Sequence, residues 1–267
     1  MAESSQAPSQ AQVVLVTGSS GRVGRAVVAA LLEQQEHVRG FDKFPTQGLA
    51  DQVIADITDR AAVRHAFRNV HTLIHLAATP DDVDNPVADL FPPNIVGAYE
   101  VLEAARLAGV RRIIVASTAQ VVWYQRERGP FPIRVTDLTT PRSWYAATKV
   151  FLEAASRALH ESLGLEVLVA RLGWCPRSRE QVEEMHRTSW APDVYLSPHD
   201  VGRFFALAVR CPLPAPYYVA FVTSRPANLE ILDLQPALRL GYQPQHTWPE
   251  GLPQDLLAPE MLSQPPA

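Results

Sequence analysis

The chain has 267 residues, 47% of them hydrophobic, and a formal net charge of −4. This length suits one α/β domain with a modest appendage, and the slightly acidic balance offers no basic surface for nucleic acid. Two cysteines, Cys175 and Cys211, are too few for a disulfide framework, and no apolar run reaches the ~18 residues of a membrane span. Because residues 1–10 lack the basic and apolar regions of a signal peptide, we expect a cytoplasmic protein that acts on a small molecule. We expect no nucleic-acid or membrane partner and no metal site, and homo-oligomerisation is left open.

The first strand and helix are joined by a glycine-rich turn. Residues 13–16 are apolar and β-branched, residues 17–24 contain the pattern G-x-x-G-x-x-G, and residues 25–32 have helical character. Strand, glycine turn and helix in this order predict a dinucleotide site, because the backbone can approach a pyrophosphate that the helix N-terminus also faces. The cofactor-binding residues predicted here are Gly18, Ser20, Gly21, Arg22, Val23 and Gly24.

Two carboxylates follow at the ends of the next strands. Residues 37–41 predict a strand that ends at Asp42, about twenty residues past the glycines, where a carboxylate can accept hydrogen bonds from the adenosine ribose. A carboxylate there would repel a 2′-phosphate, so Asp42 favours NAD over NADP. Lys43 is the next residue, and because its cation could contact a 2′-phosphate, the alternative of NADP stays open. Residues 53–55 predict a short strand with Asp56 at its end.

The remaining elements alternate in the same way. Further strands are predicted at residues 72–76, 113–116 and 166–170. Helices are predicted at residues 93–108, with Gly109 as the C-cap, and over a long segment that contains Tyr145 and ends at Gly164. This alternation predicts an α/β fold, a doubly wound parallel sheet (Rossmann fold) with a small C-terminal substrate-binding lobe.

The chain is divided into four predicted segments. They are a disordered N-terminal arm (1–11), an NAD-binding Rossmann domain (12–172), a substrate lobe with returning Rossmann elements (173–248) and a proline-rich C-terminal tail (249–267).

A tyrosine and a lysine stand four residues apart in the long helix. Only two of the 24 basic residues are lysines, and one of them, Lys149, follows Tyr145 at the spacing that places both side chains on one helical face. A nearby ammonium lowers the pKa of a phenol from its ordinary value of about 10. The pair therefore predicts a general acid/base, and the alternative is a helix with a buried tyrosine and a solvated lysine.

Together the glycine turn and the tyrosine–lysine pair resemble the extended short-chain dehydrogenase/reductase family, the branch that contains NAD-dependent epimerases, dehydratases and sugar dehydrogenases. The resemblance runs from about Val13 to about Tyr242. Further segments agree in order and spacing, namely Asp56-Ile57, His75–Ala78, Asn94–Gly97, Ala116–Ala119, Arg171–Gly173 and Ser197–Val201. In size and motifs the chain is similar to the uronate dehydrogenase-like members.

The resemblance implies NAD as cofactor and a catalytic set of Tyr145, Lys149, Thr118 and Asn94. Tyr145 would accept the hydroxyl proton, Lys149 would lower its pKa and anchor the nicotinamide ribose, and Thr118 would hold the substrate oxygen. Ser117 would pack beneath Thr118, and Asn94 would help to order Lys149 and a water. Beyond the glycine turn and Asp42, the implied cofactor-binding residues are Asp56, Ile57, Leu76, Ala77, Ala78, Asn94, Tyr145 and Lys149. His75 is expected to be a packed strand residue.

The residues after Thr118 bear on the reaction type. Dehydratases of the family carry an acidic pair there, whereas Ala119 and Gln120 can neither donate nor accept the required protons. Fewer than a hundred residues follow the sixth strand, which leaves little room for the nucleotide pocket of an epimerase. We therefore predict an NAD-dependent dehydrogenase acting on a sugar, sugar acid or small alcohol. A nucleotide-sugar epimerase and a non-catalytic dinucleotide-binding regulator are the alternatives.

The predicted substrate pocket departs from that of the uronate dehydrogenases. Trp174 stands where those enzymes carry a small polar residue. The segment 176–190 supplies Arg177, Arg179 and Arg187, any of which could form a bidentate pair with a carboxylate.

Overall fold

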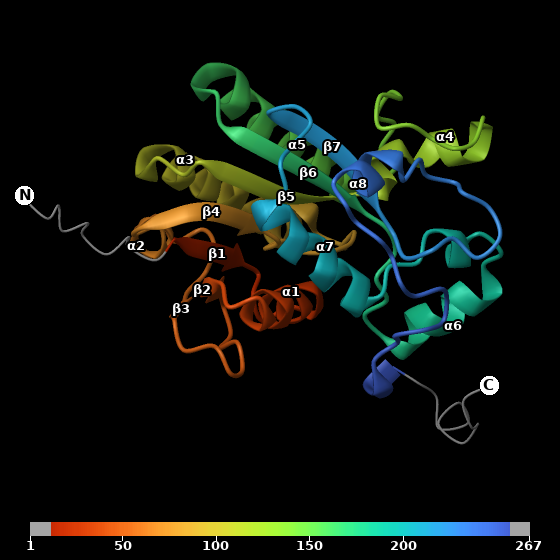
Figure 1. Cartoon of the computed structure of the whole chain (residues 1–267), viewed down its shortest axis with the longest axis horizontal. Coiled ribbons are helices and arrows are strands. Elements are labelled where there is room, and N and C mark those ends of the chain that lie inside the picture. The colour runs from red at the N-terminus through yellow and green to blue at the C-terminus, as the bar shows by residue number, and fades with distance from the viewer. Residues whose placement is uncertain (1–11, 257–267) are drawn as a thin grey trace, which may run out of the picture.

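Seven parallel strands form the centre of the molecule in the computed structural model, which describes residues 12–256 (Figure 1). The strand order is β3-β2-β1-β4-β5-β6-β7, so the chain runs outward from β1 in one direction and then returns to β4 to run in the other. Open parallel sheets bind ligands at such a reversal, outside the carboxyl ends of the strands. The predicted doubly wound parallel sheet is confirmed.

The strands lie close to where the sequence predicts them. They are β1 (Val13–Thr17), β2 (His37–Asp42), β3 (Gln52–Ile54), β4 (Val70–His75), β5 (Arg112–Thr118), β6 (Glu166–Leu172) and β7 (Tyr217–Val222). Every residue of β1 and β5 is buried, as expected for central parallel strands covered on both faces. β7 belongs to the segment 173–248, from which the Rossmann sheet therefore takes its last strand.

Helices cover both faces of the sheet. One face carries α1 (Arg22–Glu33), α7 (Pro198–Arg210) and α8 (Gln235–Arg239), and the other carries α2 (Arg60–Ala66), α3 (Ala98–Ala108) and α5 (Trp144–Leu163). Two further helices, α4 (Trp123–Arg128) and α6 (Arg179–Arg187), lie beyond one end of the sheet, on the right in Figure 1. Within residues 12–256 no helix is both long and apolar enough to cross a membrane.

Two of the predicted helix ends are confirmed, and one predicted helix begins with π-helical turns. Gly109 and Gly164 end α3 and α5 with a φ of +68° each, the left-handed conformation that glycine adopts without strain. The helix predicted over residues 93–108 is present, but its first turns form the π-helix η2 (Pro92–Gly97), and the regular α-helix α3 begins at Ala98. Two prolines stand at the start of η2, where the first turn of a helix leaves the backbone N–H groups unbonded and proline is therefore tolerated.

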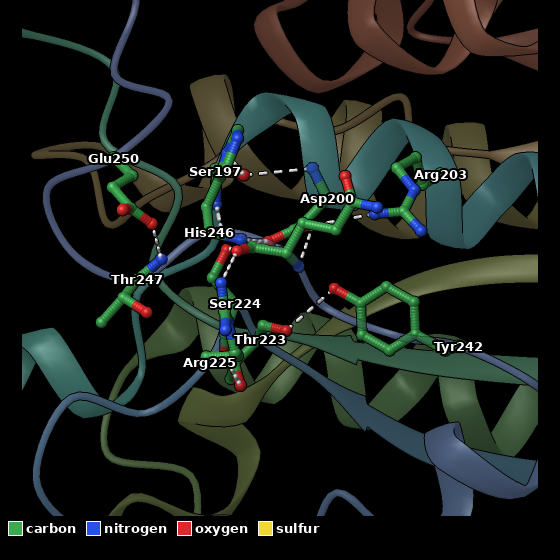
Figure 2. A network of polar contacts seen from close by, with 11 residues as sticks. Ser197, Asp200, Arg203, Thr223, Ser224, Arg225, Tyr242, His246, Thr247 and Glu250 are labelled. Atoms are coloured by element: carbon green, nitrogen blue, oxygen red, sulfur yellow. Dashed lines mark hydrogen bonds and ion pairs between the residues drawn. The ribbon is translucent and has the colours of Figure 1, made fainter.

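A buried carboxylate joins α7 to the C-terminal segment (Figure 2). Asp200 is completely buried and accepts hydrogen bonds from Ser224 Oγ at 2.7 Å and from the backbone N–H groups of Gln245 and His246 at 2.8 and 3.1 Å. Ser197, the N-cap of α7, lies 2.9 Å from His246 Nδ1. These contacts fasten residues 245–246 against the sheet edge, so Asp200 has a structural role.

The predicted C-terminal tail begins as packed chain. Leu256 is buried, and Asp255 accepts a hydrogen bond of 2.9 Å from Arg22 in the glycine turn. The short helix η5 (Gln254–Leu256) therefore lies against the body of the molecule. The rest of the predicted tail, residues 257–267, and the predicted arm at residues 1–11 lie outside the described residues.

Candidate active site

The glycine turn between β1 and α1 has the shape of a cradle for a pyrophosphate. Gly18 has a φ of +74°, and a Cβ there would lie 2.7 Å from the backbone nitrogen of Ala77. A Cβ at Gly24 would clash with the carbonyl oxygen of Gly18, so the helix rests directly on the turn. Gly21 is the N-cap of α1 and offers no side chain to its first amides. These open backbone groups fit the phosphates of a dinucleotide.

The two predicted ribose and adenine residues lie beside that turn. Asp42 Oδ2 accepts the backbone N–H of Ser20 at 3.0 Å, so its carboxylate is fixed against the glycine turn. Lys43 Nζ lies 2.7 Å from Asp56 Oδ2, and this hydrogen bond is the main reason why the pKa of Asp56 falls to about 2. Lys43 is paired with Asp56 and therefore does not neutralise the negative charge of Asp42.

Tyr145, Lys149 and Thr118 lie together where β5 meets α5. Lys149 Nζ donates a hydrogen bond of 3.0 Å to the carbonyl of Ala116 and lies 5.8 Å from the centre of the Tyr145 ring. Thr118 is the last residue of β5, and its side chain is close enough to the Tyr145 phenol to lower the pKa of that phenol. The structure thus brings three of the four predicted catalytic residues to one point.

Burial controls the ionisation of this pair. Desolvation raises the pKa of Tyr145 to about 12, although Arg177 and Thr118 act in the opposite direction. Desolvation also lowers the pKa of Lys149 to about 8. The predicted fall of the Tyr145 pKa toward neutrality is wrong for this structure, because desolvation outweighs the groups that lower this pKa and the Lys149 ammonium is turned toward the Ala116 carbonyl.

The layer beneath the catalytic residues is closed by internal pairs. Ser117 Oγ donates to Glu153 at 2.5 Å, and Glu153 forms a buried ion pair with Arg171 at 2.9 Å. His75 Nδ1 lies 2.8 Å from Thr17 Oγ1, and burial lowers the pKa of His75 to about 3. As expected, His75 is a packed strand residue, whereas Ser117 is buried, is bonded to Glu153 and also lines the cavity described below.

Asn94 lies behind the site. Its Oδ1 accepts the backbone N–H of Thr79 at 2.8 Å, and its Nδ2 donates to the Thr79 carbonyl at 3.0 Å and to Thr148 Oγ1 at 3.1 Å. Asn94 therefore fastens the loop after β4 to α5, next to Tyr145. Its predicted action on Lys149 and on the cofactor stays a prediction.

One cavity of about 1340 Å³ connects the glycine turn with the catalytic residues. Thr118 and every predicted cofactor-binding residue except Asn94 line it, namely Gly18, Ser20, Gly21, Arg22, Val23, Gly24, Asp42, Asp56, Ile57, Leu76, Ala77, Ala78, Tyr145 and Lys149. The cavity also extends to α4 and to the segment after α6, where Trp123, Arg126 and Trp190 line it. Sequence reasoning missed these residues, since only their position after Thr118 or Trp174 could have drawn attention to them.

Only one of the three predicted substrate arginines reaches the cavity. Arg177 lines it and pairs with Asp81 at 2.6 Å. Arg179 donates to the Asp255 carbonyl at 3.2 Å, and Arg187 is exposed on α6. Neither of these two is among the cavity residues.

Comparison with known proteins identifies the family. The model of the NAD-dependent epimerase/dehydratase family matches residues 14–175, from β1 to just beyond β6. The chain belongs to this family. It is an oxidoreductase of the extended short-chain dehydrogenase/reductase type, and NAD is its cofactor.

Individual relatives cover most of the chain. An L-arabinose 1-dehydrogenase (NAD(P)(+)) from Haloferax volcanii is 32% identical over 248 residues, which is 87% of this chain and 96% of that protein. A uronate dehydrogenase from Pseudomonas putida is 29% identical over 164 residues, 60% of each chain. The crystal structure of a glucuronic acid dehydrogenase from Chromohalobacter salexigens has a TM-score of 0.72 and 29% identity, and the match covers 88% of this chain and 85% of that one.

The position of Asp42 predicts the choice between the two nicotinamide cofactors. NAD should bind at least tenfold more tightly than NADP, a difference of about 1.4 kcal/mol, because the fixed carboxylate repels a 2′-phosphate. Asp42→Asn keeps an acceptor for the Ser20 N–H and removes the charge, so it should narrow this gap. Calorimetric titration of both cofactors measures the effect, with Asp51→Asn as control, since Asp51 pairs with Arg39 away from the cavity. Equal wild-type affinities would contradict the role of Asp42.

Proposed function

We propose that the chain oxidises a hydroxyl group of a sugar, a sugar acid or a small alcohol, with Tyr145, Lys149 and Thr118 as its catalytic residues. The observation that carries the proposal is the single cavity that joins the glycine turn to these three side chains. The names of the relatives, which are dehydrogenases of arabinose, uronates and glucuronic acid, support a substrate of this class.

The side chains suit an alcohol oxidation. When bound, NAD supplies the hydride acceptor. Thr118 and Tyr145 both contact the substrate hydroxyl, and Tyr145, in its phenolate form, takes the hydroxyl proton. The ammonium of Lys149, one helical turn away, stabilises the phenolate over the neutral phenol. Because desolvation raises the pKa of the Tyr145 phenol, its phenolate form is scarce at neutral pH and becomes more abundant as the pH rises.

Net oxidation is favoured over dehydration by the residues after Thr118. Ala119 and Gln120 form the start of the 3₁₀ turn η3 (Ala119–Val122) and both line the cavity. Neither can protonate a departing hydroxyl or remove a proton from carbon at neutral pH. The charged side chains beside Tyr145 are Lys149, Asp82, whose Oδ1 accepts the Tyr145 backbone N–H at 2.8 Å, and the ion pair of Arg177 with Asp81.

A panel of free uronates, aldoses, small alcohols and nucleotide sugars tests the proposal. With NAD and the right substrate, NADH should accumulate in proportion to the substrate consumed, measured by nicotinamide absorbance and product NMR. An epimerase restores NAD in every cycle, so isomerised product without NADH would overturn the dehydrogenase assignment. NAD binding without turnover on any member of the panel would favour a regulator.

We also propose a cytoplasmic location. Both cysteines are free, Cys175 partly and Cys211 fully buried, which suits a reducing compartment.

A further inference from the structure

Beyond the catalytic residues the cavity is lined by an arginine–tryptophan wall, made of Trp123, Arg126, Arg142, Trp174 and Trp190. Trp123 and Arg126 lie on α4, Arg142 precedes α5, Trp174 follows β6 and Trp190 follows α6. Because η3 and α4 continue directly from Thr118, one short segment presents both the hydroxyl of Thr118 and two residues of this wall, Trp123 and Arg126.

Arg126 is held between two aromatic rings. Its guanidinium carbon lies 4.7 Å from the centre of the Trp123 ring and 4.2 Å from that of Trp190. The two rings are nearly perpendicular, at 89°, with their centres 5.7 Å apart. Stacking on both rings fixes the orientation of the side chain before a ligand arrives.

This guanidinium lacks an ordinary partner. Among residues 12–256 it makes no hydrogen bond, its Nε is buried without an acceptor, and its nearest carboxylate, Glu127, is 3.8 Å away. Glu127 is shared, because it also lies 3.6 Å from Arg142 and accepts the Trp123 Nε1–H at 3.2 Å. A partly desolvated cation without a bonded anion is unfavourable. Two guanidiniums against one carboxylate leave one positive charge, which a monoanion would balance.

The cavity beside the wall is apolar. Val122, Ile133, Ile231 and Leu232 are buried members of one hydrophobic cluster, and all four line the cavity, as does Trp174. These surfaces can cover a carbon skeleton, or the carbon face of a sugar ring, but they offer no hydrogen bonds. Within residues 12–256, Arg126 Nε is the one side-chain polar atom of the wall that is buried without a hydrogen-bond partner, so the Arg126 guanidinium is the specific contact that an anionic ligand would make there.

We propose that the substrate carries a carboxylate and that Arg126 binds it, while the hydroxyl to be oxidised lies at Tyr145 and Thr118. This inference rests on the proposed function and names its substrate class, a hydroxy acid. The carboxylate could belong to a sugar acid or to a hydroxy acid with an apolar skeleton, and both kinds present the same anion to the guanidinium. A phosphate ester is a poorer match, because its two negative charges exceed the one net positive charge of the arginine–tryptophan wall.

The test compares acids with their neutral partners in wild type and in Arg126→Gln. The pairs are glucuronate with glucose, galacturonate with galactose, and 3-hydroxybutyrate with 2-butanol, and glucose 6-phosphate is the dianion. The wild-type enzyme should prefer an acid over its neutral partner. A preference seen with the uronates indicates a sugar acid as substrate, and a preference seen with 3-hydroxybutyrate indicates an apolar hydroxy acid. In Arg126→Gln the acid-to-neutral ratio of kcat/KM should fall about 30-fold, mainly through KM, as expected for loss of a charged hydrogen bond.

Arg128→Gln is the matched control. Arg128 lies on the same helix, stacks on Tyr124 at 5.6 Å and does not line the cavity, so this variant should keep the wild-type ratio. The inference is overturned if Arg126→Gln lowers acid and neutral rates alike, or if the neutral or phosphorylated member is preferred. Should Arg126→Gln fail to bind NAD, Arg126→Lys replaces it. The acid KM must then also rise, and an unchanged KM overturns the inference.

A binding measurement separates this inference from the proposed function. In the presence of NAD, the same acids should quench the tryptophan fluorescence of wild type, since Trp123 and Trp190 flank Arg126, and the quenching should weaken about 30-fold in Arg126→Gln. Quenching without NADH would defeat the proposed function alone. NADH from neutral alcohols, with no quenching by any acid, would defeat the carboxylate site alone.

Discussion

Tyr145→Phe should abolish NADH formation while leaving NAD binding intact. The substitution removes only the hydroxyl that takes the proton, and loss of a general acid/base lowers rates by about 10²- to 10⁴-fold. The ring itself remains beside Lys149, so the cavity keeps its shape. Initial rates at saturating NAD and a calorimetric titration of NAD measure the two properties. Tyr99→Phe, an exposed position on α3, is the control and should behave as wild type. Substantial turnover in Tyr145→Phe would mean that another group accepts the proton.

The same tyrosine sets the expected pH dependence. Because desolvation raises its pKa to about 12, only a small fraction of the phenol is ionised at neutral pH in the cofactor-free protein. The rate of oxidation should therefore rise with pH from 6 to about 8, where Lys149 begins to lose the proton of its ammonium, and a flat profile over this range would exclude the phenolate as the base.

Lys149→Met should destroy activity and, at the same time, stabilise the fold. The variant lacks the ammonium that favours the phenolate, so turnover should fall about 100-fold or more. The pKa of Lys149 drops from 10.5 in the unfolded chain to about 8 in the folded one, so folding is penalised by the buried charge. This penalty is fully present below pH 8 and disappears as the pH rises above 10.5. The shift corresponds to about 3 kcal/mol, less what the lost bond to Ala116 contributed.

Urea denaturation of wild type and Lys149→Met at pH 7 and pH 10.5 checks this prediction. The variant should be more stable by about 2 kcal/mol at pH 7, and the difference should shrink at the higher pH. The chain offers a natural control, since Lys43, its other lysine, is more than half exposed and paired with Asp56. Lys43→Met should show no gain. A destabilised Lys149→Met would mean that the ammonium is solvated in the folded protein.

The elements that depend on local sequence could be predicted without coordinates. The glycine turn is one, because the conformation of Gly18 and the close contact at Gly24 are demands of the turn itself. The apolar strands, the glycine caps of α3 and α5, and the four-residue spacing of Tyr145 and Lys149 are others. Each follows from backbone sterics or from a period of one helical turn, and these depend on neighbours in sequence.

The tertiary structure decided what depends on burial and on distant partners. Desolvation, which no spacing encodes, reversed the expected direction of the Tyr145 pKa. Asn94 bonds Thr79 and Thr148 behind the site, and of the three predicted arginines only Arg177 lines the cavity. The pairing of Arg126 with Trp190 joins residues 64 positions apart in the chain. Such a contact exists only once α4 and the segment after α6 meet beyond the carboxyl ends of the strands, so the sequence alone could determine the chemistry of this site but not the group that selects its substrate.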